Sequence, residues 1–525
     1  MARAESYRHR SLKQLALPYA SNDSPASTEP AFGAGSNVLT SLRGYAERRP
    51  GFAAYMAAVT GTVRRFFSWE TWNGRFFLMC SSVSGGSVYA YKLEIGVDSA
   101  FSLIYGPVTA TKPFDFVSAN NRCFFGNDQL VWKYEGVGTT VHPVGIGMDA
   151  DHKPTLVPIS GALTTYNGGF KYVFCFGSST SEHVSSPSLE SLVTGNLTAQ
   201  SVQVTCQKTQ DTQVDRLHVY RTTDGGGGIY FEITGSPFVH APGVGTMTIT
   251  DATTDINLSS TTAPLGGMNE PAMIAGPSGL TGLTWFANRL WGIRDNEVRY
   301  SGWEEIDNGV AEESWPVDNV FMFPSAVHAL APVQDGLLVF QANGVWKISG
   351  DSLDTFRKDP LFFGYGCRGP NCITSRGRVT AWLDVGNTIR ITDGVSQEEL
   401  SVPIRPDLAN INHSTASITF YTQGTYHWLV VSNTAKLFVY DLDTAQWMPP
   451  WVVTASAIHS GEASAGSFYL YAALTSGVIR RMTPAVYVDG NSTLYAASVA
   501  TNLVDIVPDA LPGDIGEMEY LGIET

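Results

Sequence analysis

Short runs of apolar and β-branched residues, separated by tight polar turns, dominate the chain from about residue 56 onward. The runs are rich in Val, Ile, Phe, Tyr, Trp and Thr, and they end at Gly, Asn or Asp, which is typical of strands joined by turns. No segment shows several turns of apolar residues at a 3.6-residue period with capping residues at both ends. The pattern predicts an all-β fold in which helix is scarce.

One arrangement recurs: an apolar strand, a tight polar turn, and a second strand that carries an aromatic residue. Gly336–Ile348 is the clearest instance, because its Asn343-Gly344 pair suits a two-residue hairpin turn. The arrangement occurs at 72–91, 121–132, 288–300, 336–348, 378–391, 425–440 and 467–481.

The hairpins from 288 onward recur every 40–50 residues, which is the length of one four-stranded propeller blade. A large β-sandwich or an ordinary meander also produces serial hairpins. The regular spacing over these hairpins favours a β-propeller.

The hairpin period is interrupted between roughly 150 and 270. Apolar segments such as Phe170–Phe176 and Val214–Arg221 alternate there with turn signals, as in a small β-sandwich. The predicted organisation is therefore a β-propeller with an inserted fibronectin-like β-sandwich and extended N- and C-terminal arms. Its parts are 1–55 (extended N-terminal arm), 56–145 (propeller, first part), 146–271 (inserted β-sandwich), 272–485 (propeller, remaining blades) and 486–525 (acidic C-terminal strap).

The two ends of the chain differ from its middle. The N-terminal segment begins basic and continues rich in Ser, Pro and Ala, which is typical of an arm that a partner orders. Residues 482–525 contain no Lys or Arg and could form a solvated tail or a docking strap. Their acidic residues are Asp489, Asp505, Asp509, Asp514, Glu517, Glu519 and Glu524.

The 525 residues carry a formal net charge of −15, and only 15% of them are charged. This balance argues against nonspecific binding of nucleic acid through a basic surface, although an acidic wall that DNA slides past is compatible with it. The sequence contains no stretch of about 18 apolar residues, so no transmembrane helix is predicted. The N-terminus lacks the apolar run of a signal peptide. We expect a protein made in the cytoplasm that does not insert in a membrane.

Most of the six cysteines lie within or beside apolar or aromatic runs, so buried free thiols are the favoured interpretation. A small loop disulfide between Cys367 and Cys372 is the alternative. No Cys or His spacing matches a zinc site. The cysteines are Cys80, Cys123, Cys175, Cys206, Cys367 and Cys372.

No motif predicts a catalytic, cofactor-binding or metal-binding residue. Gly225–Gly228 opens no helix, so it is better explained as a hairpin tip than as a phosphate cradle. Asp441 and Asp443 could face a calcium ion, but hairpin turns routinely carry such residues. The chain has no GxSxG, no HExxH and no Asp-box turn, and nothing marks a pair of catalytic carboxylates. Arg64–Phe67 is the one basic-aromatic cluster, and a strand edge explains it.

Several segments together resemble the tail nozzle proteins of short-tailed bacteriophages, also known as tail tubular B-like or packaged-DNA stabilisation proteins. Leu42–Gly51 resembles their N-terminal signature, which ends in R-P-G. Phe286–Trp291 followed by Val298–Ser301 resembles their F-x-x-R-L-W … V-x-x-S hairpin. Later blades are matched in order by Val327–Ile348, Gly364–Gly394 and Phe438–Trp447, the last resembling a Y-D-x-x-x-x-x-W turn.

This resemblance covers about 42–136 and 280–450, and the inserted sandwich is similar to fibronectin-type insertions of such proteins. It implies a structural virion protein of the phage tail, without cofactors and not an enzyme. The implied partners are the chain itself as a homohexamer, an adaptor or head-completion protein above it, and tail fibre or needle proteins. Double-stranded DNA would pass through the ring without sequence-specific binding. The blade number, the host and the gating loops do not follow from the sequence.

Two other classes of function fit an all-β chain of this kind. A receptor-binding adhesin would use residues 150–270 as its binding module. A propeller glycan hydrolase would gather acids and aromatics in one pocket.

Overall fold

The computed structural model is almost entirely β-strand over the part of the chain that it describes. It describes residues 32–40, 46–129, 131–149, 151–163, 165–180, 183–263, 279–303, 313–316, 318–483, 487–490, 493–494 and 496–501. The helical elements of these residues are η1 (Asp255–Asn257), η2 (Pro370–Cys372), η3 (Val402–Ile404) and α2 (Arg405–Leu408). The prediction of an all-β fold with little helix is confirmed.

Seven antiparallel sheets of four strands recur along the described chain. In six of them the strands pair in sequence order, and the seventh takes its fourth strand from the N-terminal end. Such a series of four-stranded meanders is a β-propeller, as predicted. The first two sheets are β5 (Thr62–Glu70), β6 (Phe76–Ser84), β7 (Ser87–Glu94) and β8 (Ser102–Thr109), and then β9 (Asp115–Ala119), β10 (Arg122–Gly126), β11 (Val131–Tyr134) and β12 (Val141–Pro143). The next three are β20 (Thr281–Phe286), β21 (Arg289–Arg294), β22 (Glu297–Tyr300) and β23 (Val320–Met322); β24 (Val327–Val333), β25 (Gly336–Gln341), β26 (Gly344–Ser349) and β27 (Arg357–Phe363); and β28 (Ile373–Arg376), β29 (Val379–Leu383), β30 (Ile389–Thr392) and β31 (Gln397–Glu399). The last two are β32 (Ser417–Gln423), β33 (Tyr426–Ser432), β34 (Leu437–Asp441) and β35 (Gln446–Trp447), and then β36 (Ala457–Ser464), β37 (Ser467–Ala473), β38 (Ile479–Thr483) and β4 (Gly51–Met56).

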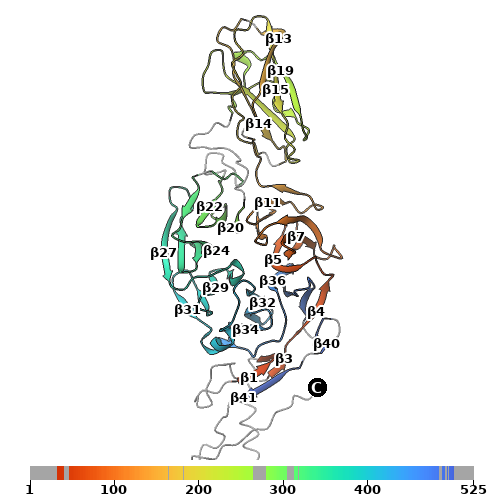
Figure 1. Cartoon of the computed structure of the whole chain (residues 1–525), viewed down its shortest axis with the longest axis vertical. Coiled ribbons are helices and arrows are strands. Elements are labelled where there is room, and N and C mark those ends of the chain that lie inside the picture. Colours follow the sequence, from red (N-terminus) through yellow and green to blue (C-terminus); the bar gives the residue numbers. More distant parts are fainter. Residues whose placement is uncertain are drawn as a thin grey trace, which may run out of the picture. The chain divides into compact units, whose positions relative to one another are not determined.

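The described chain forms two compact units. The first comprises its residues up to Cys123, 323–350 and those from Thr355 onward, and the second comprises Phe124–Met322 with Asp351–Asp354. In the first unit the leading strands of the sheets are neighbours in the order β9, β5, β36, β32, β28 and β24. Figure 1 labels β5, β36, β32 and β24 of this series. The first strand of each of these sheets is therefore its inner strand, and the fourth is its outer strand.

Bulky apolar side chains fill the spaces between successive sheets of the first unit. Trp382, Trp428 and Trp447 are almost completely buried there. The indole of Trp447 also donates a hydrogen bond of 2.7 Å to the carbonyl of Leu400, which belongs to the preceding sheet segment. Large side chains that bridge neighbouring sheets explain why each hairpin carries an aromatic residue.

The last sheet is completed by a strand from the other end of the chain. β4 pairs with β38 as the outer strand, with Phe52 opposite Met482 and Gly51 opposite Thr483. A strand from the N-terminal end therefore supplies the fourth strand of this sheet and ties the two ends of the chain together. Part of the segment expected as an N-terminal arm therefore belongs to the propeller.

Three small two-stranded sheets are formed by the segments near the two ends. They are β1 (Phe32–Ser36) with β41 (Ser498–Thr501), β2 (Val38–Thr40) with β3 (Ala46–Arg48), and β39 (Val488–Asp489) with β40 (Thr493–Leu494). Residues 1–31 of the expected arm and 502–525 of the expected strap lie outside the described residues.

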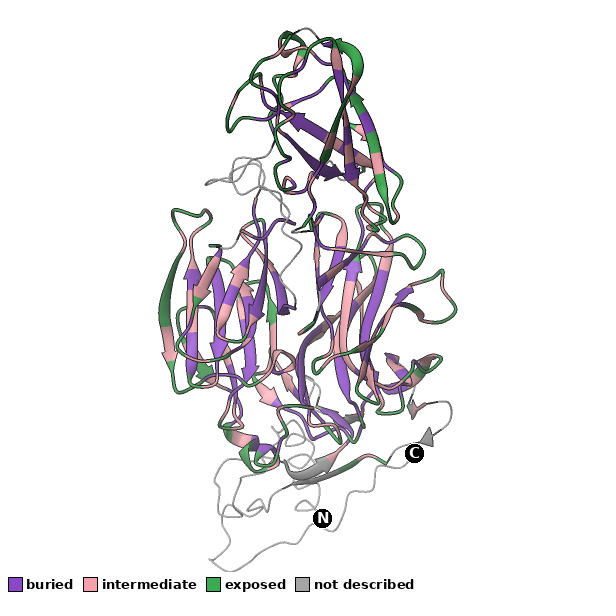
Figure 2. Ribbon diagram, turned by 45° about the horizontal axis from the view of Figure 1, so that its top comes forward, coloured by how far each residue is buried: buried purple, intermediate pink, exposed green. Residues whose placement is uncertain are grey.

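The second unit contains the inserted β-sandwich. Its two sheets bury a common core that includes Phe174, Phe176, Val204 and Leu217, and purple in Figure 2 marks these buried stretches. One sheet is β13 (Thr155–Leu163), β15 (Gln200–Gln207) and β19 (Thr246–Asp251), and the other is β14 (Tyr172–Gly177) and β16 (Arg216–Arg221) with β17 (Phe231–Glu232) and β18 (Phe238–Val239).

The free edge of β14 is covered by residues 185–194, in which a Ser or Thr recurs at every third position. Ser185, Ser188, Ser191 and Thr194 each donate a backbone N–H to a carbonyl along β14 or just before it. Each hydroxyl oxygen also accepts a backbone N–H from the same stretch, at 2.9–3.1 Å. The segment thereby satisfies the polar groups that an edge strand would otherwise expose.

Candidate functional site

The two terminal segments and the last sheet of the propeller meet at Arg49, the arginine of the R-P-G signature. Its side chain is fully buried. Nη1 and Nη2 donate to the two carboxylate oxygens of Asp489 at 3.1 and 2.6 Å. Nε donates to Asn37 Oδ1 at 2.9 Å, and Nη1 also donates to the carbonyl of Pro50. A guanidinium with this many partners binds a carboxylate in a fixed, bidentate geometry.

Asn37 connects Arg49 to two further segments. Its Oδ1 also accepts the backbone N–H of Val452 at 2.7 Å, and its Nδ2 donates to the carbonyl of Ala496 at 2.7 Å. Its φ of 58° lies in the left-handed region, which asparagine tolerates better than most residues. Residues separated by more than 400 positions in the sequence are thus joined through one side chain.

Asp489 and Trp451 complete this arrangement, which we call the terminal clamp (Asn37, Arg49, Trp451 and Asp489). Asp489 Oδ1 accepts the backbone N–H of Phe52 in β4 at 3.0 Å. The indole of Trp451 donates to the carbonyl of Val38 at 3.3 Å, and its ring lies 6.0 Å from the Arg49 guanidinium carbon. The clamp holds both terminal segments against the strand that completes the propeller, so its role is mechanical.

The second segment that resembles the nozzle proteins, Phe286–Trp291 with Val298–Ser301, also has a structural role. Ala287 and Asn288 both have positive φ, as a two-residue hairpin turn requires. Trp291 donates its indole N–H to the carbonyl of Phe286 at 2.8 Å and stacks on Tyr300 with ring centroids 4.6 Å apart. The hydroxyl of Ser301 accepts the backbone N–H of Leu290, which fixes the third strand of the sheet against the second.

The late Y-D-x-x-x-x-x-W segment forms a turn. Asp441 Oδ1 accepts the backbone N–H groups of Asp443 and Thr444 at 2.9 and 3.3 Å. The carboxylate of Asp443 lies 2.9 Å from the imidazole Nδ1 of His427. These contacts account for both acids that the sequence singled out as possible calcium ligands. Within the described ranges, no group of three or more His, Cys, Asp or Glu side chains could hold a metal ion.

The remaining sequence candidates take ordinary places in the fold. Gly225–Gly228 lies in the loop between β16 and β17, and Gly225 and Gly228 have positive φ. Arg64–Phe67 lies on the inner strand β5, where Arg65 pairs with Asp115 at 2.6 Å and Phe67 stacks on Phe116. Among the described residues, no helix has the length and apolar character to cross a bilayer.

All six cysteines are free and buried, which confirms the favoured interpretation. Cys367 precedes η2 and Cys372 is its last residue, and their thiols donate to the carbonyls of Gly369 and His413, respectively. The neighbouring Cys367 thiol and burial raise the pKa of Cys372 well above its ordinary value. Cys372 is therefore a thiol, not a thiolate, at neutral pH.

One serine–histidine pair lies between neighbouring inner strands of the first unit. Ser68 Oγ of β5 is 3.0 Å from His459 Nε2 of β36, and the ring of Phe66 stacks on the imidazole. Burial lowers the pKa of His459 to about 4. A general base for catalysis near neutral pH needs a pKa close to 7, so the pair suits a packing role better than nucleophilic chemistry.

Because of His459, we expect the folded protein to lose stability in mild acid. The unfolded chain takes up the proton near pH 6.5 and the folded chain only near pH 4, so the stability that His459 provides above pH 6.5 is lost as the pH falls through that window. At pH 5 the loss is roughly 2 kcal/mol, at about 1.4 kcal/mol per pH unit. Urea unfolding at pH 7 and pH 5 should show a smaller difference for His459→Gln than for the wild type. An equal difference for both proteins would contradict this prediction.

A buried ion pair joins three segments of the second unit. Lys133 Nζ of β11 lies 2.7 Å from Glu313 Oε2, and both side chains are essentially inaccessible to solvent. The same carboxylate oxygen accepts the backbone N–H of Gly145 at 3.0 Å and lies 4.0 Å from Nδ1 of His183 in the sandwich module. Glu313 therefore connects a propeller sheet, the chain that leads into the sandwich, and the sandwich itself.

Sequence reasoning identified Arg49 but none of its partners, and it missed Lys133 and Glu313. Asp489 lies 440 positions from Arg49, and Glu313 lies 180 positions from Lys133. No local spacing marks such pairs. The only local signal would have been a lone charged residue within an apolar strand, as Lys133 is in Val131–Tyr134.

Comparisons with known proteins show likeness to several solved structures and to nothing else. No family model and no curated protein matches the chain. The computationally designed Ika8 protein has a TM-score of 0.34 at 9% identity, over 82% of this chain and 99% of that one. Sqt1 from Chaetomium thermophilum has a TM-score of 0.36 at 10% identity, over 83% and 99%. BBS1N, crystallised in complex with ARL6DN, has a TM-score of 0.27 at 11% identity, over 83% and 98%. At these TM-scores, the fold assignment rests on the sheet topology.

Proposed function

We propose that this protein is a structural subunit of a bacteriophage tail nozzle, which forms a homohexameric ring around the path of the genome. The proposal rests on the structural roles of the residues that carry the resemblance to nozzle proteins. Arg49 clamps the terminal segments, and Trp291 and Trp447 lock strands within and between sheets. Residues that identify the resemblance thus serve rigidity, which is what a channel-forming part requires.

The fold supports the same proposal in a second way. Each four-stranded sheet leaves only a short outer edge, and β4 ties the last sheet to the N-terminal end of the chain. In the proposed particle the terminal segments contact neighbouring copies, the adaptor above, and the fibre or needle proteins. The genome passes through the ring, and the chain performs no catalysis.

The mass of the purified protein tests the proposal directly. One chain is 56.7 kDa, so six copies, 6 × 56.7, give about 340 kDa. Mass photometry of the full chain should show this species. A population that remains at the mass of one chain at micromolar concentration would contradict the hexamer.

An acidic ring predicts weak binding of DNA. Six copies at −15 each carry −90, and this charge opposes the phosphate backbone. Fluorescence anisotropy with a labelled duplex in low salt should show weak binding with a shallow salt dependence. Tight binding with a slope as steep as about −5, which corresponds to roughly five or six phosphate contacts, would contradict a channel wall that does not retain DNA.

A receptor-binding role for the sandwich is the second candidate, and exposed apolar side chains favour it. Isolated exposed apolar residues are common, but several on one small module can mark an interaction surface. Binding of the full chain to host cells, abolished by Leu192→Asp, would support this role over the nozzle. The exposed apolar residues of the module are Val157, Leu189, Leu192, Val193, Ile229, Val239, Val244 and Ile256.

A glycan hydrolase is the third class. It needs two carboxylates placed about a substrate. The sequence marks no such pair. The two acids that it offered as possible calcium ligands are engaged, because Asp441 holds a turn and Asp443 pairs with His427.

A further inference from the structure

Arg481 of β38 is flanked by tyrosine rings from both neighbouring strands of the last propeller sheet. Its guanidinium carbon lies 4.5 Å from the ring centroid of Tyr55 in β4 and 4.4 Å from that of Tyr469 in β37. Tyr471 stands directly opposite Arg481 on β37. The three tyrosines belong to, or pack against, the apolar core between this sheet and the sheet of β5. The rings therefore hold the guanidinium in a fixed place, while the side chain stays partly exposed.

This guanidinium has no counterion among the residues that the structure describes. No carboxylate there lies within ion-pair distance of Arg481, and its Nε is buried without a hydrogen-bond partner. Burial raises the pKa of Tyr55 and Tyr471, so both phenols are neutral near pH 7 and supply no negative charge. A partly buried cation without a counterion is costly, so this position suits an incoming anion.

Other partly buried arginines of the first unit differ from Arg481 in this respect. Each has a carboxylate within 2.6–2.7 Å, and the pairs are Arg65 with Asp115, Arg75 with Glu94, and Arg390 with Asp384. An arginine that is held by rings but left without a carboxylate is thus an exception within the unit.

The chain that follows β38 runs beside the same sheet. Gly490 donates its N–H to the carbonyl of Phe52 in β4 at 2.7 Å, and the N–H of Ala54 donates to the carbonyl of Gly490 at 3.3 Å. Asp489 on this stretch binds Arg49 at 2.6 Å. One carboxylate of the acidic end of the chain therefore already pairs with an arginine at this sheet.

The rest of the acidic end is long enough to reach Arg481. The described residues end at Thr501, and the 24 residues 502–525 contain no Lys or Arg. Fully extended, they span about 80 Å, which exceeds the diameter of about 50 Å expected for a compact unit of this size. Their acids are Asp505, Asp509, Asp514, Glu517, Glu519 and Glu524.

We propose that Arg481, with Tyr55 and Tyr469, forms a carboxylate-binding site that is occupied by an acid of residues 502–525 of the same copy. A guanidinium binds a carboxylate through two parallel N–H donors. A segment joined to its site by a short stretch of chain has a local concentration on the order of millimolar, which favours the same copy over a neighbouring one. The proposal concerns one copy and does not depend on the nozzle function.

Amide hydrogen exchange of residues 502–525 in the full chain, measured by mass spectrometry, tests this contact. These amides should exchange more slowly in low salt than in about 0.5 M salt, because salt screens a partly exposed charge pair. Arg481→Gln should accelerate their exchange in low salt by about tenfold, as expected for loss of a charge-assisted hydrogen bond. Exchange in β37 should stay as in the wild type, which would show that the sheet remains folded.

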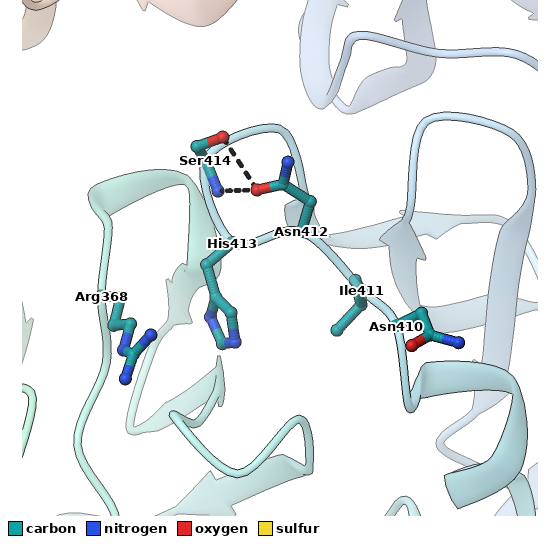
Figure 3. A pocket seen from close by; sticks show the side chains of 6 residues that line it. All are labelled: Arg368, Asn410, Ile411, Asn412, His413 and Ser414. Carbon is teal, nitrogen blue, oxygen red and sulfur yellow. Dashed lines mark hydrogen bonds between the residues drawn. The ribbon is translucent and has the colours of Figure 1, made fainter.

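Arg368→Gln is the matched control. Arg368 is exposed and lines an open pocket of about 600 Å³ in the first unit, where Figure 3 shows it beside His413. It also has no ion pair among the described residues, so its loss changes the net charge in the same way. Exchange of residues 502–525 should be unchanged. Arg480→Gln removes the neighbouring cation, which has no described ring contact, and should have a smaller effect than Arg481→Gln.

Neutralising the acids tests the occupant. With Arg481 intact, the combined amide variant should lose the protection as fully as Arg481→Gln does. This variant carries Asp505→Asn, Asp509→Asn, Asp514→Asn, Glu517→Gln, Glu519→Gln and Glu524→Gln.

The remaining outcomes would overturn the proposal. Isotopically labelled Arg481→Gln, incubated with unlabelled wild type, should stay unprotected at residues 502–525, and recovery of its protection would assign the contact to a neighbouring copy instead. Protection that does not depend on salt, or equal exchange in Arg481→Gln and Arg368→Gln with β37 folded, would show that Arg481 does not hold the acidic segment.

Discussion

Replacing Arg49 with methionine is expected to release the terminal segments while the propeller sheets stay folded. The substitution leaves the Asp489 carboxylate without its bidentate partner and Asn37 Oδ1 without the Nε donor. Removing one member of a buried ion pair costs about 3–5 kcal/mol. Amide hydrogen exchange at Phe52, Gly490 and Val452, whose N–H groups are held in or beside the clamp, should accelerate by about 10²–10³-fold.

Two further variants, Arg49→Lys and Arg405→Gln, serve as comparisons for this result. Lysine keeps the charge but not the planar fork, so Arg49→Lys should fall between the wild type and Arg49→Met. Arg405 makes a similar two-pronged pair with Glu399 but is 54% exposed, so its loss should change stability little. Equal exchange rates in Arg49→Met and wild type would show that the clamp does not hold the termini.

Replacing Lys133 with methionine is expected to destabilise the second unit by a similar amount. Glu313 would remain buried without its Lys133 partner, retaining the Gly145 N–H at 3.0 Å. The loss is about 3–5 kcal/mol. For a unit of this size each kcal/mol corresponds to roughly 2–4 °C, so its calorimetric transition should fall by about 10 °C.

The double variant Lys133→Met with Glu313→Gln separates the buried charge from the packing. A neutral amide at 313 can still accept from Gly145, so the double variant should recover much of the lost stability. Lys171→Met is the control, because the Lys171–Glu190 pair is exposed and its loss should shift the transition little. A double variant as unstable as Lys133→Met would contradict the charge-burial explanation.

The sequence predicted the two central strands of every propeller sheet but not its inner and outer strands. Each of the seven predicted hairpins is the second and third strand of one propeller sheet, as in β25 with β26 and β33 with β34. These strands pair on both sides and end at tight turns, so their apolar pattern is the most regular. Outer strands such as β27 are largely exposed and carry charged residues, which weakens the pattern.

Long-range pairings escaped the sequence for a physical reason. β4 begins at the Gly of the R-P-G signature, yet its partner β38 lies more than 400 residues away, so local period gave no sign that it completes the last sheet. The cover on β14 was also missed, although Ser185, Ser188, Ser191 and Thr194 repeat visibly every third residue. A three-residue period matches neither a strand nor an α-helix, and it was therefore not interpreted.

Electron microscopy of the purified full chain tests the proposed ring most directly. Two-dimensional class averages should show six-fold rings with a central hole, each subunit a propeller. Class averages of single propellers, or of assemblies without a central hole, would contradict the proposed nozzle.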